Sequence, residues 1–598
     1  MNMNLTPEER EIGKQNFYAA VGSEHTRRDF LKQSLAAAVV GGGGLAGFYF
    51  GYSSIKDPLR VGVIGTGDEG NVLIGAMNPS YLQVVAIADI RPYSVYRAFH
   101  GEVAQPARPG LMTVYGWDTE QEARKHVKVY TGDYRELFKD SSVEAVVIAL
   151  PLHLHAKVAI EAMMAGKHVL TEKLMGRTVA QCKEMARYAE TTGKILAVGH
   201  QRHYNVLYDN AKDTIERGLL GDIHYIRAQW HRVKDTWKPG LPPGTRKLPA
   251  GAKPEKGEPD LLKTQASWKR RLEEAKKVRD SEEIDLWTKK LVQLEKQMQE
   301  KPEDGPPLDS ALAAKYDYRG VEVKDPAGKV RYQAPPLEEL IRWRLWNRTG
   351  AGIMAELGSH QLDAASIFIA AAHAAAAKGA KGAKQPRLVH PLSVSAVANR
   401  NLYDWDREIE DHLSCLIEFP APGYNEKDAL GRLRTITVAY ASINGNGYGG
   451  YGECVFGTKG TLLLEEEKQA LLYPTESDTS VVSTKIEVKK KPDKDAVLDT
   501  QASPGSAQAA GAAALGGEVS RGYREELEHW AWCIRNPDPK NKPRCHPEVA
   551  LKDAVIALTT NVAAQTRRII KFDEAWFDSK SDATPDDSKI DLTQYKAP

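Results

Sequence analysis

The stretch that decides the fold is "LRVGVIGTGDEGNVLIGAM", residues 59–77, in which an apolar run precedes a glycine-rich loop and a helical pattern. A second apolar run, "LQVVAIAD" at 82–89, ends in an acidic residue about 20 positions beyond the loop. Gly65, Gly67 and Gly70 have the spacing that lets a backbone turn tightly, approach a pyrophosphate and pack a helix closely on a strand. This order of elements predicts a dinucleotide-binding unit.

The cofactor contacts that we expect follow from this loop. The carboxylate of Asp89 can accept hydrogen bonds from the hydroxyls of the adenosine ribose. A carboxylate at this place repels a 2′-phosphate and so favours NAD, whereas Arg91 leaves NADP open as a cofactor. The loop residues predicted to bind the cofactor are Gly65, Thr66, Gly67, Asp68, Glu69 and Gly70.

Strand and helix patterns alternate up to residue 200. Strands are predicted at 143–150, 167–172 and 194–200, with helices at 155–166 and 179–193. Such alternation is typical of a doubly wound parallel sheet with its ligand at the carboxyl ends of the strands. The sequence therefore predicts an α/β protein whose residues 56–200 form a Rossmann domain that binds NAD(P).

Further motifs resemble those of the Gfo/Idh/MocA family of NAD(P)-dependent oxidoreductases. They are Pro151 with His155, then "GKHVLTEK" at 166–173, and later "GSHQLD" at 358–363. The resemblance extends over about 59–235 and 336–575. It implies a C-terminal α/β domain with a large, mostly open antiparallel sheet, like that of glucose-fructose oxidoreductase, which covers the nicotinamide and often mediates oligomers.

The resemblance also implies roles for individual residues. Lys173 is the acid/base near a sugar hydroxyl, with His360 as its partner, and Pro151, His155 and Glu172 belong to the cofactor site. The chemistry agrees, because a base must take the hydroxyl proton as hydride leaves the carbon. Glu356 precedes His360 by one helical turn and Asp363 follows it, so both are predicted to share its face, where a carboxylate fixes the tautomer of the ring.

Two positions depart from the family pattern. Leu152 replaces the usual asparagine after Pro151, which removes one cofactor hydrogen bond, and Leu174 replaces the proline after Lys173. A cis peptide bond before a residue other than proline costs about 3 kcal/mol. The Lys173–Leu174 bond is therefore predicted to be trans.

The stretch "GHQRHYN", residues 199–205, ends a predicted strand beside the same cleft. We expect Gln201 to contact the cofactor, and His203 and Tyr204, together with Asp363, to contact the substrate. A metal site built from Glu356, His360 and Asp363 has no fourth ligand in view, so no metal is predicted.

The N-terminus contains "HTRRDFLK", residues 25–32, followed by an apolar stretch rich in Gly and Ala up to residue 52. These features resemble a twin-arginine (Tat) signal, an address that the Tat translocase reads. We predict that residues 1–55 are this signal and that the protein is exported to the periplasm. No A-x-A cleavage site follows, which leaves open an uncleaved signal that holds the protein at the inner membrane.

The remaining segments complete the predicted domain organisation. Residues 201–235 and 336–580 form the substrate and oligomerisation domain, 236–335 are a charged, partly helical insertion, and 581–598 are a polar tail. A net charge of +2 gives no support for a nucleic-acid partner. The five cysteines form no CxxC pair and are predicted to be buried free thiols.

The sequence thus predicts an exported oxidoreductase that transfers hydride between a sugar or polyol carbon and NAD. Because no nicotinamide pool exists outside the cytoplasm, the cofactor is predicted to be tightly bound. An NAD-dependent glycosidase that oxidises its substrate transiently and eliminates the aglycone is an alternative. A nucleotide-binding scaffold without catalysis is another. The expected partners are a small carbohydrate, the Tat translocase during export and a second copy bound through the C-terminal sheet.

Overall fold

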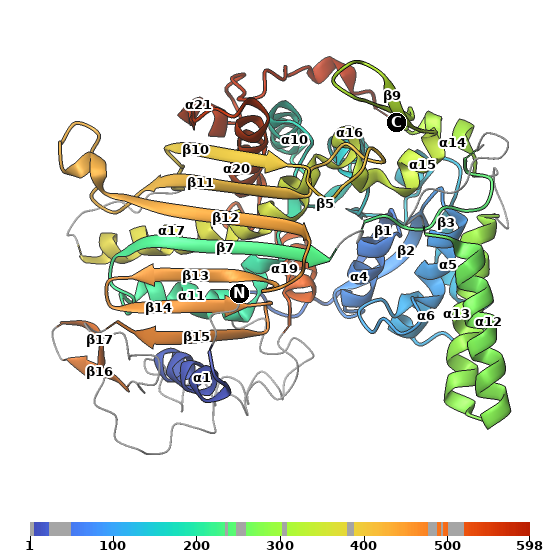
Figure 1. Cartoon of the computed structure of the whole chain (residues 1–598), viewed down its shortest axis with the longest axis horizontal. Coiled ribbons are helices and arrows are strands. Elements are labelled where there is room, and N and C mark those ends of the chain that lie inside the picture. The colour runs from blue at the N-terminus through green and yellow to red at the C-terminus, as the bar shows by residue number, and fades with distance from the viewer. Residues whose placement is uncertain are drawn as a thin grey trace.

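A computed structural model describes the chain apart from residues 1–4, 23–49, 234–236, 247–258, 302–307, 380–387, 476–486, 492–493, 500–519 and 598. The twin-arginine motif and most of the apolar stretch behind it lie outside the described residues. The described residues form two α/β domains, which stand side by side in Figure 1 around two large sheets.

The first sheet has six parallel strands in the order β3-β2-β1-β4-β5-β6. These strands are β1 (Leu59–Ile64), β2 (Leu82–Ala88), β3 (Lys128–Tyr130), β4 (Ala145–Ile148), β5 (His168–Glu172) and β6 (Leu196–Gly199). Their runs are apolar because helices cover both faces of the sheet. The order reverses between β1 and β4, which is where such sheets bind ligands. The predicted Rossmann domain is confirmed.

The glycine-rich loop between β1 and α4 (Asp68–Ala76) adopts the predicted tight geometry. Gly65 has φ +86°, and a Cβ on this residue would lie 2.4 Å from the carbonyl oxygen of Ala149. A Cβ on Gly70 would lie 2.1 Å from the carbonyl oxygen of Gly65, so the helix packs against the loop at this glycine. A Cβ on Gly67 would meet nothing within 4 Å.

The second sheet has eight strands in the order β15-β14-β13-β7-β12-β11-β10-β18. They are β7 (Ile223–Val233), β10 (Ser393–Asn399), β11 (His412–Pro420), β12 (Thr435–Gly445), β13 (Tyr451–Gly457), β14 (Gly460–Glu465), β15 (Gln469–Pro474) and β18 (Ile570–Lys571). The sheet is mixed and not purely antiparallel, because β7 and β12 pair in parallel at its centre. A long crossover, which parallel pairing requires, separates these two strands in the sequence.

One face of this second sheet is open over β10, β11 and β12, as predicted, but the same face packs against α1 (Pro7–Gly22) at β15. Helices of the described chain cover the opposite face. The helices α11 (Val206–Glu216), α17 (Ser359–Gly379) and α20 (Pro547–Thr566) pack on that face. Along β11 the side chains alternate between buried and exposed, with Leu416 51% exposed on the other face. Figure 1 shows this sheet as a broad layer with its helices behind it.

The helix α1 (Pro7–Gly22) was predicted to belong to the signal but packs on β15 at the edge of the second sheet. Phe17 and Ala20 are fully buried, and Asn16 Nδ2 donates a hydrogen bond to the Leu472 carbonyl at 3.1 Å. These contacts make residues 7–22 part of the C-terminal domain. Of the described residues, none belongs to a helix both long and apolar enough to cross a bilayer.

Two C-terminal segments differ from the predicted boundaries. The helix α19 (Tyr523–Arg535) places Leu527 and Trp530 in the apolar core beneath β1 and β2, so it belongs to the Rossmann domain. The predicted polar tail lies against α10 (Val179–Thr192) of the Rossmann domain. There Lys183 Nζ donates hydrogen bonds to the carbonyls of Ser581 and Ala583 at 3.0 and 2.8 Å. The position of α19 depends on apolar contacts and that of the tail on main-chain carbonyls, in both cases with partners far away in the sequence.

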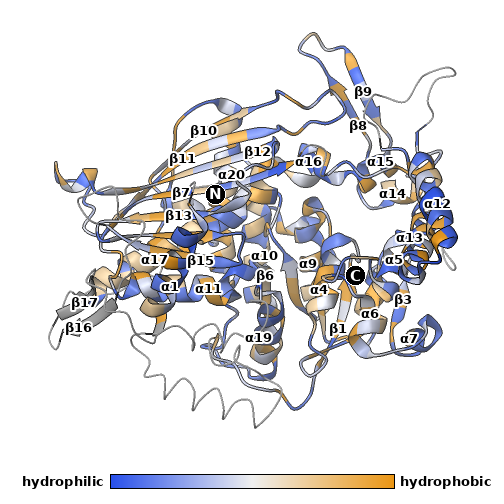
Figure 2. Ribbon diagram, turned by 60° about the horizontal axis from the view of Figure 1, so that its bottom comes forward, coloured by the Kyte–Doolittle hydropathy of each residue, from blue (hydrophilic) through white to orange (hydrophobic). Residues whose placement is uncertain are grey.

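The insertion forms a helical hairpin against the Rossmann domain. Its helices are α12 (Leu261–Val278) and α13 (Ser281–Gln299), each begun by an aspartate side chain that accepts hydrogen bonds from main-chain N–H groups. Their surfaces are mostly hydrophilic in Figure 2, but Trp287 and Leu294 are buried. Gln293 Nε2 donates to the carbonyl of Gly101 at 3.1 Å, which fixes α13 beside α5 (Pro92–His100).

All five cysteines are buried and free, as predicted.

We expect Gly70→Ala to lower the free energy of unfolding by about 1–3 kcal/mol, because the new methyl group would overlap the Gly65 carbonyl. Gly67→Ala is the matched control, since its Cβ meets no atom and its φ of −70° suits alanine. Thermal and denaturant unfolding of the nucleotide-free proteins measures both effects. Equal stability of the two variants would contradict the close packing at Gly70.

Candidate active site

A cavity of about 820 Å³ lies at the carboxyl ends of the Rossmann strands. The glycine loop, the end of β2 and the end of β5 form one side of it. The end of β7 and the segment before α17 form the other side, so both domains contribute. The predicted site residues that line this cavity are Gly65, Gly67, Asp68, Glu69, Asp89, Arg91, Pro151, Glu172, Lys173, Gln201, Glu356 and His360.

The loop end of the cavity fits a pyrophosphate. The helix α4 begins here, so its first N–H groups and its positive dipole end are directed at the loop. Open space at Gly67 allows a ligand to approach the backbone closely. The side chain of Asp68 pairs with Arg97 at 2.7 Å, and this guanidinium keeps the pKa of the carboxyl below its usual value although burial opposes it.

The ribose end of the cavity is built around Asp89. Its Oδ2 accepts a hydrogen bond from the Thr66 N–H at 2.7 Å, and its Oδ1 accepts one from the Arg91 N–H at 2.8 Å. The Arg91 guanidinium turns to Glu300, with 3.0 Å between Nε and Oε1. Glu300 ends α13, and its side chain is 4% exposed, so the insertion supplies a buried partner for Arg91.

Lys173 follows β5 and reaches across to the second domain. Its Nζ donates a hydrogen bond to the Glu356 carbonyl at 2.7 Å. The Lys173–Leu174 peptide bond is cis, so the prediction of a trans bond was wrong. Leu174 is buried and its carbonyl lies 2.9 Å from His155 Nδ1, so surrounding contacts hold this peptide in place.

His360 lies at the start of α17, after the short π-helix η4 (Met354–Gly358). Its ring centroid is 5.2 Å from that of Trp230. Burial, together with the positive charges of Lys173 and Arg202, lowers the pKa of His360 well below its usual value, so the ring is neutral near pH 7. A neutral imidazole offers one donor and one acceptor to a substrate oxygen.

Glu356 does not orient His360 in the way that the sequence predicted. The π-helix changes the spacing of side chains between these residues, and the Glu356 carboxylate accepts a hydrogen bond from Arg344 Nε at 2.8 Å. Burial alone would raise the pKa of Glu356, but the charges of Arg344 and Lys173 lower it to about 2. Glu356 thus lines the cavity with an ionised carboxylate, and its main-chain carbonyl accepts the hydrogen bond from Lys173.

Two buried polar side chains that line the cavity have atoms without hydrogen-bond partners among the described residues. Neither side-chain amide atom of Gln201 has a hydrogen-bond partner, nor does Glu172 Oε1. Burial and the nearby carboxylate of Glu69 raise the pKa of Glu172 well above its usual value, so it can donate as an acid. Orphaned polar atoms beside a glycine cradle fit a bound nicotinamide dinucleotide.

Several predicted contacts are not part of the lining. Thr66 and Gly70 shape the loop from inside, and His155 holds the main chain at Leu174 and Leu150. Tyr204 is buried in the Rossmann core, with its hydroxyl 2.8 Å from His529 Nδ1. His203 and Asp363 bond to each other at 2.8 Å outside the cavity. His203, Tyr204 and Asp363, which the sequence predicts to contact the substrate, are thus not part of the lining of this cavity.

The cavity also contains residues that the sequence did not indicate. Trp230 and Arg232 stand two positions apart at the end of β7, and Arg344 precedes α17 in the chain. Alternation of buried and exposed positions along 223–233 is a signal for that strand, but no motif marks its last residues as part of a site. The same holds for Arg521 and Tyr523 at the start of α19.

Residues 59–200 match the family described as "Oxidoreductase family, NAD-binding Rossmann fold". An uncharacterised oxidoreductase of Schizosaccharomyces pombe is 38% identical over 151 residues, which are 23% of this chain and 41% of that protein. Inositol 2-dehydrogenase 1 of Saccharopolyspora erythraea is 30% identical over 169 residues, which are 27% of this chain and 43% of that protein. The NAD-binding function predicted for residues 59–200 agrees with these matches.

The similarity in sequence is limited to part of each protein, because the chain spans about two fifths of the length of the first curated relatives that it matches. Among solved structures, an aldose-aldose oxidoreductase from Caulobacter crescentus, complexed with glycerol, aligns with a TM-score of 0.47 at 15% identity. That alignment covers 86% of this chain and 100% of the other.

Proposed function

We propose that this protein is an exported, NAD-dependent oxidoreductase that transfers hydride between the nicotinamide and a secondary-alcohol carbon of a sugar or polyol. The observation that carries the proposal is the position of Lys173, whose amine lies in the same cavity as the glycine loop. An inositol dehydrogenase among the relatives of the Rossmann residues supports a polyhydroxylated substrate.

The residues of the chain divide the chemistry between them. NAD, when bound, supplies the hydride acceptor. Lys173 Nζ takes the hydroxyl proton as the carbon is oxidised, and the Glu356 carbonyl fixes the direction of this amine. Neutral His360 donates one hydrogen bond to the same oxygen, and Arg232 and Arg344 offer donors to other hydroxyls of the substrate.

The ribose end supports NAD over NADP. A 2′-phosphate would meet the carboxylates of Asp89 and Glu300, whereas the guanidinium of Arg91 already pairs with Glu300. Like charges at such a site disfavour the phosphate.

Tight binding is supported by the way the insertion closes this end of the cavity. Gln297 of α13 belongs to the lining of the cavity, together with Tyr316 and Tyr318 of the same insertion. A cofactor enclosed in this manner is exchanged slowly. An exported enzyme needs such retention, because the hydride must then return within the same site to a second carbonyl substrate or to a later intermediate.

Export rests on the twin-arginine motif, which the Tat translocase would read. We propose that the signal is retained and holds the enzyme on the periplasmic side of the inner membrane. The support is α1, which precedes the motif in sequence and is part of the second domain. Cleavage behind the motif would separate that helix from the rest of the chain.

A homo-oligomer through the open face of the second sheet is part of the same proposal. Val397 and Leu416 of neighbouring strands are 43% and 51% exposed on this face, which α1 covers only at the β15 edge. A second copy would bury this apolar surface.

The protein purified from the periplasmic or membrane fraction is expected to contain about one NAD per chain, because a residence time of minutes or longer survives purification. Denaturation followed by chromatography measures the nucleotide released. Sugar alone should then give a single reduction of bound NAD, and a carbonyl acceptor should restore turnover. A protein that arrives empty yet works well on micromolar added NAD would overturn tight binding. Release of aglycone from aryl glycosides without net NADH would identify the glycosidase instead.

Lys173→Ala should lower turnover by roughly 100-fold to 10,000-fold with little change in nucleotide affinity, because only the proton transfer loses its group. Lys157→Ala is the control, since Lys157 is exposed on α9 (His155–Met164). The rate of hydride transfer is measured as the reduction of bound NAD in a single-turnover experiment with substrate. A variant that keeps most of its turnover would remove Lys173 from the mechanism and favour a scaffold or another base.

Glu300→Gln should raise the affinity for NADP relative to NAD by roughly tenfold, because it removes one negative charge and frees the Arg91 guanidinium. Glu295→Gln, an exposed change on the same helix, should leave the ratio as it is. Titration of both nucleotides into nucleotide-free protein by fluorescence gives the ratio. An unchanged ratio in Glu300→Gln would contradict this account of the preference.

A further inference from the structure

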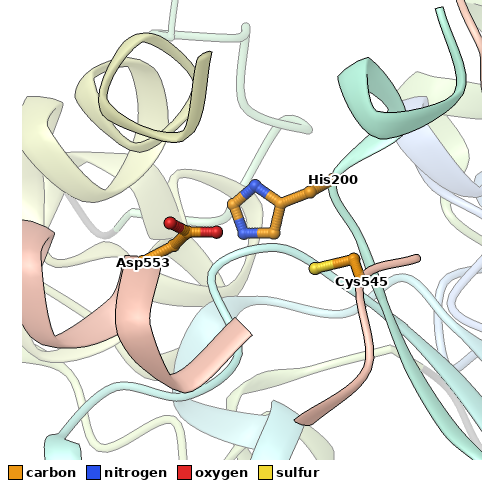
Figure 3. A group of neighbouring side chains, drawn as sticks. All are labelled: His200, Cys545 and Asp553. Carbon is orange, nitrogen blue, oxygen red and sulfur yellow. The ribbon is translucent and has the colours of Figure 1, made fainter. Parts of the chain in front are cut away.

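Behind the cavity, three buried side chains of different types turn toward one another (Figure 3): His200 after β6, Cys545 before α20, and Asp553 within α20. A nitrogen of His200, the sulfur of Cys545 and a carboxylate oxygen of Asp553 all lie within 4.8 Å of one another. Each of these residues is at most 2% exposed. The group is separate from the lining of the cavity.

His200 supplies an independent sign that a ligand is missing from this group. Neither of its ring nitrogens has a hydrogen-bond partner among the described residues. The distance from His200 Nδ1 to Asp363 Oδ2 is 3.6 Å, which is too long for a hydrogen bond. A buried imidazole with both nitrogens unpaired is costly, and a bound cation would remove that cost.

The acids around His200 lead to the same conclusion. Asp363 Oδ2 and Asp553 Oδ2 are buried without hydrogen-bond partners, and so are both carboxylate oxygens of Glu526. Lys552 interacts with Asp363 and Asp553, which leaves one ammonium against several carboxyl groups and a thiol. A divalent cation would balance the charge of this region better than the lysine alone.

The donor types select the metal. One thiolate, one imidazole and carboxylate oxygens suit Zn²⁺, which binds four such ligands in a tetrahedron at about 2.0–2.3 Å. Donor atoms within 4.8 Å of one another need only small side-chain movements to reach those distances. Calcium and magnesium prefer oxygen ligands alone.

We propose that His200, Cys545, Asp553 and Asp363 form a buried structural zinc site. Asp363 supplies the fourth ligand. It belongs to a second group, with His203 and Asp553, whose donor atoms also lie within 4.8 Å of one another, and Asp553 is common to both groups. His203 Nε2 lies 2.8 Å from Asp363 Oδ1 and so orients that carboxylate from outside the metal.

The site joins two segments that contribute to the lining of the cavity to a third, α20, which does not line it. His200 immediately precedes Gln201, which lines the cavity, and Asp363 lies less than one helical turn after His360. Cys545 lies in the loop before α20 and Asp553 lies within α20, and this helix packs against β10 and α10. With all four positions filled by protein, the zinc has a structural role. The inference is independent of the proposed reaction.

The test is the metal content of the full chain, purified without chelators and analysed by mass spectrometry of the elements. We expect about one zinc per chain in the wild type and less than about one tenth of that in Cys545→Ser and Asp553→Asn. Cys182→Ser is the matched control, because Cys182 is equally buried but lies outside the group, and it should retain its zinc.

Substitution with Co²⁺ gives a second readout that does not depend on activity. The wild type should show a thiolate-to-cobalt absorption band in the near ultraviolet, and Cys545→Ser should lack it. Removal of the metal should lower the Tm of the wild type and of Cys182→Ser only. A wild type that stays free of zinc after incubation with Zn²⁺ would overturn the proposal. A full equivalent of zinc in a folded Cys545→Ser variant would do so too.

Discussion

The hydrogen bond from Lys173 Nζ to the Glu356 carbonyl joins the two domains at the point where the reaction would occur. Lys173 ends a strand of the first sheet, and Glu356 belongs to the π-helix that leads into α17 of the second domain. The amine can be directed only if these elements keep a fixed separation. The rest of the structure provides that separation, through the His155 contact behind Leu174 and the Arg344 pair on Glu356.

The Rossmann half of this arrangement could be predicted from the sequence, because its signals are local. Alternating apolar runs and helical patterns, and the spacing of Gly65, Gly67 and Gly70, each depend on residues close together in the chain. The motifs also predicted that Lys173 and His360 belong to the site, and both side chains line the cavity. The directions of Tyr204 and Asp363 could not be predicted, since neither the end of a strand, near Tyr204, nor a helical motif, which contains Asp363, determines which neighbour a side chain meets. Tyr204 turns to His529 and Asp363 to His203, both partners from other elements.

Placement of the longer segments depended on surfaces that sequence patterns do not describe. The helix α19 has the composition of any amphipathic helix, and only the core beneath β1 accounts for its position in the Rossmann domain. The insertion reads as a solvated hairpin because its surface is mostly charged. Its docking depends on Glu300 and Gln293, two polar residues whose partners, Arg91 and the Gly101 carbonyl, lie far away in the sequence.

The two domains are joined by an apolar core, whereas the helical hairpin is joined to the Rossmann domain by polar contacts. The difference in strength between these attachments determines how a cofactor can enter or leave. One apolar core contains Val146 and Ile160 of the Rossmann domain together with Phe368 and Val438 of the second domain. Separating the domains would expose that core to water, at about 25 cal/mol for each Å² of apolar surface. Polar pairs at Glu300 and Gln293 are prominent in holding the hairpin, and such contacts are exchanged for water at a smaller net cost. Movement of the hairpin, and not opening of the domains, is therefore the easier route to the adenosine end of the cavity. The proposed retention of the cofactor would then depend on the hairpin, a segment that has no counterpart in the motifs of the Rossmann fold.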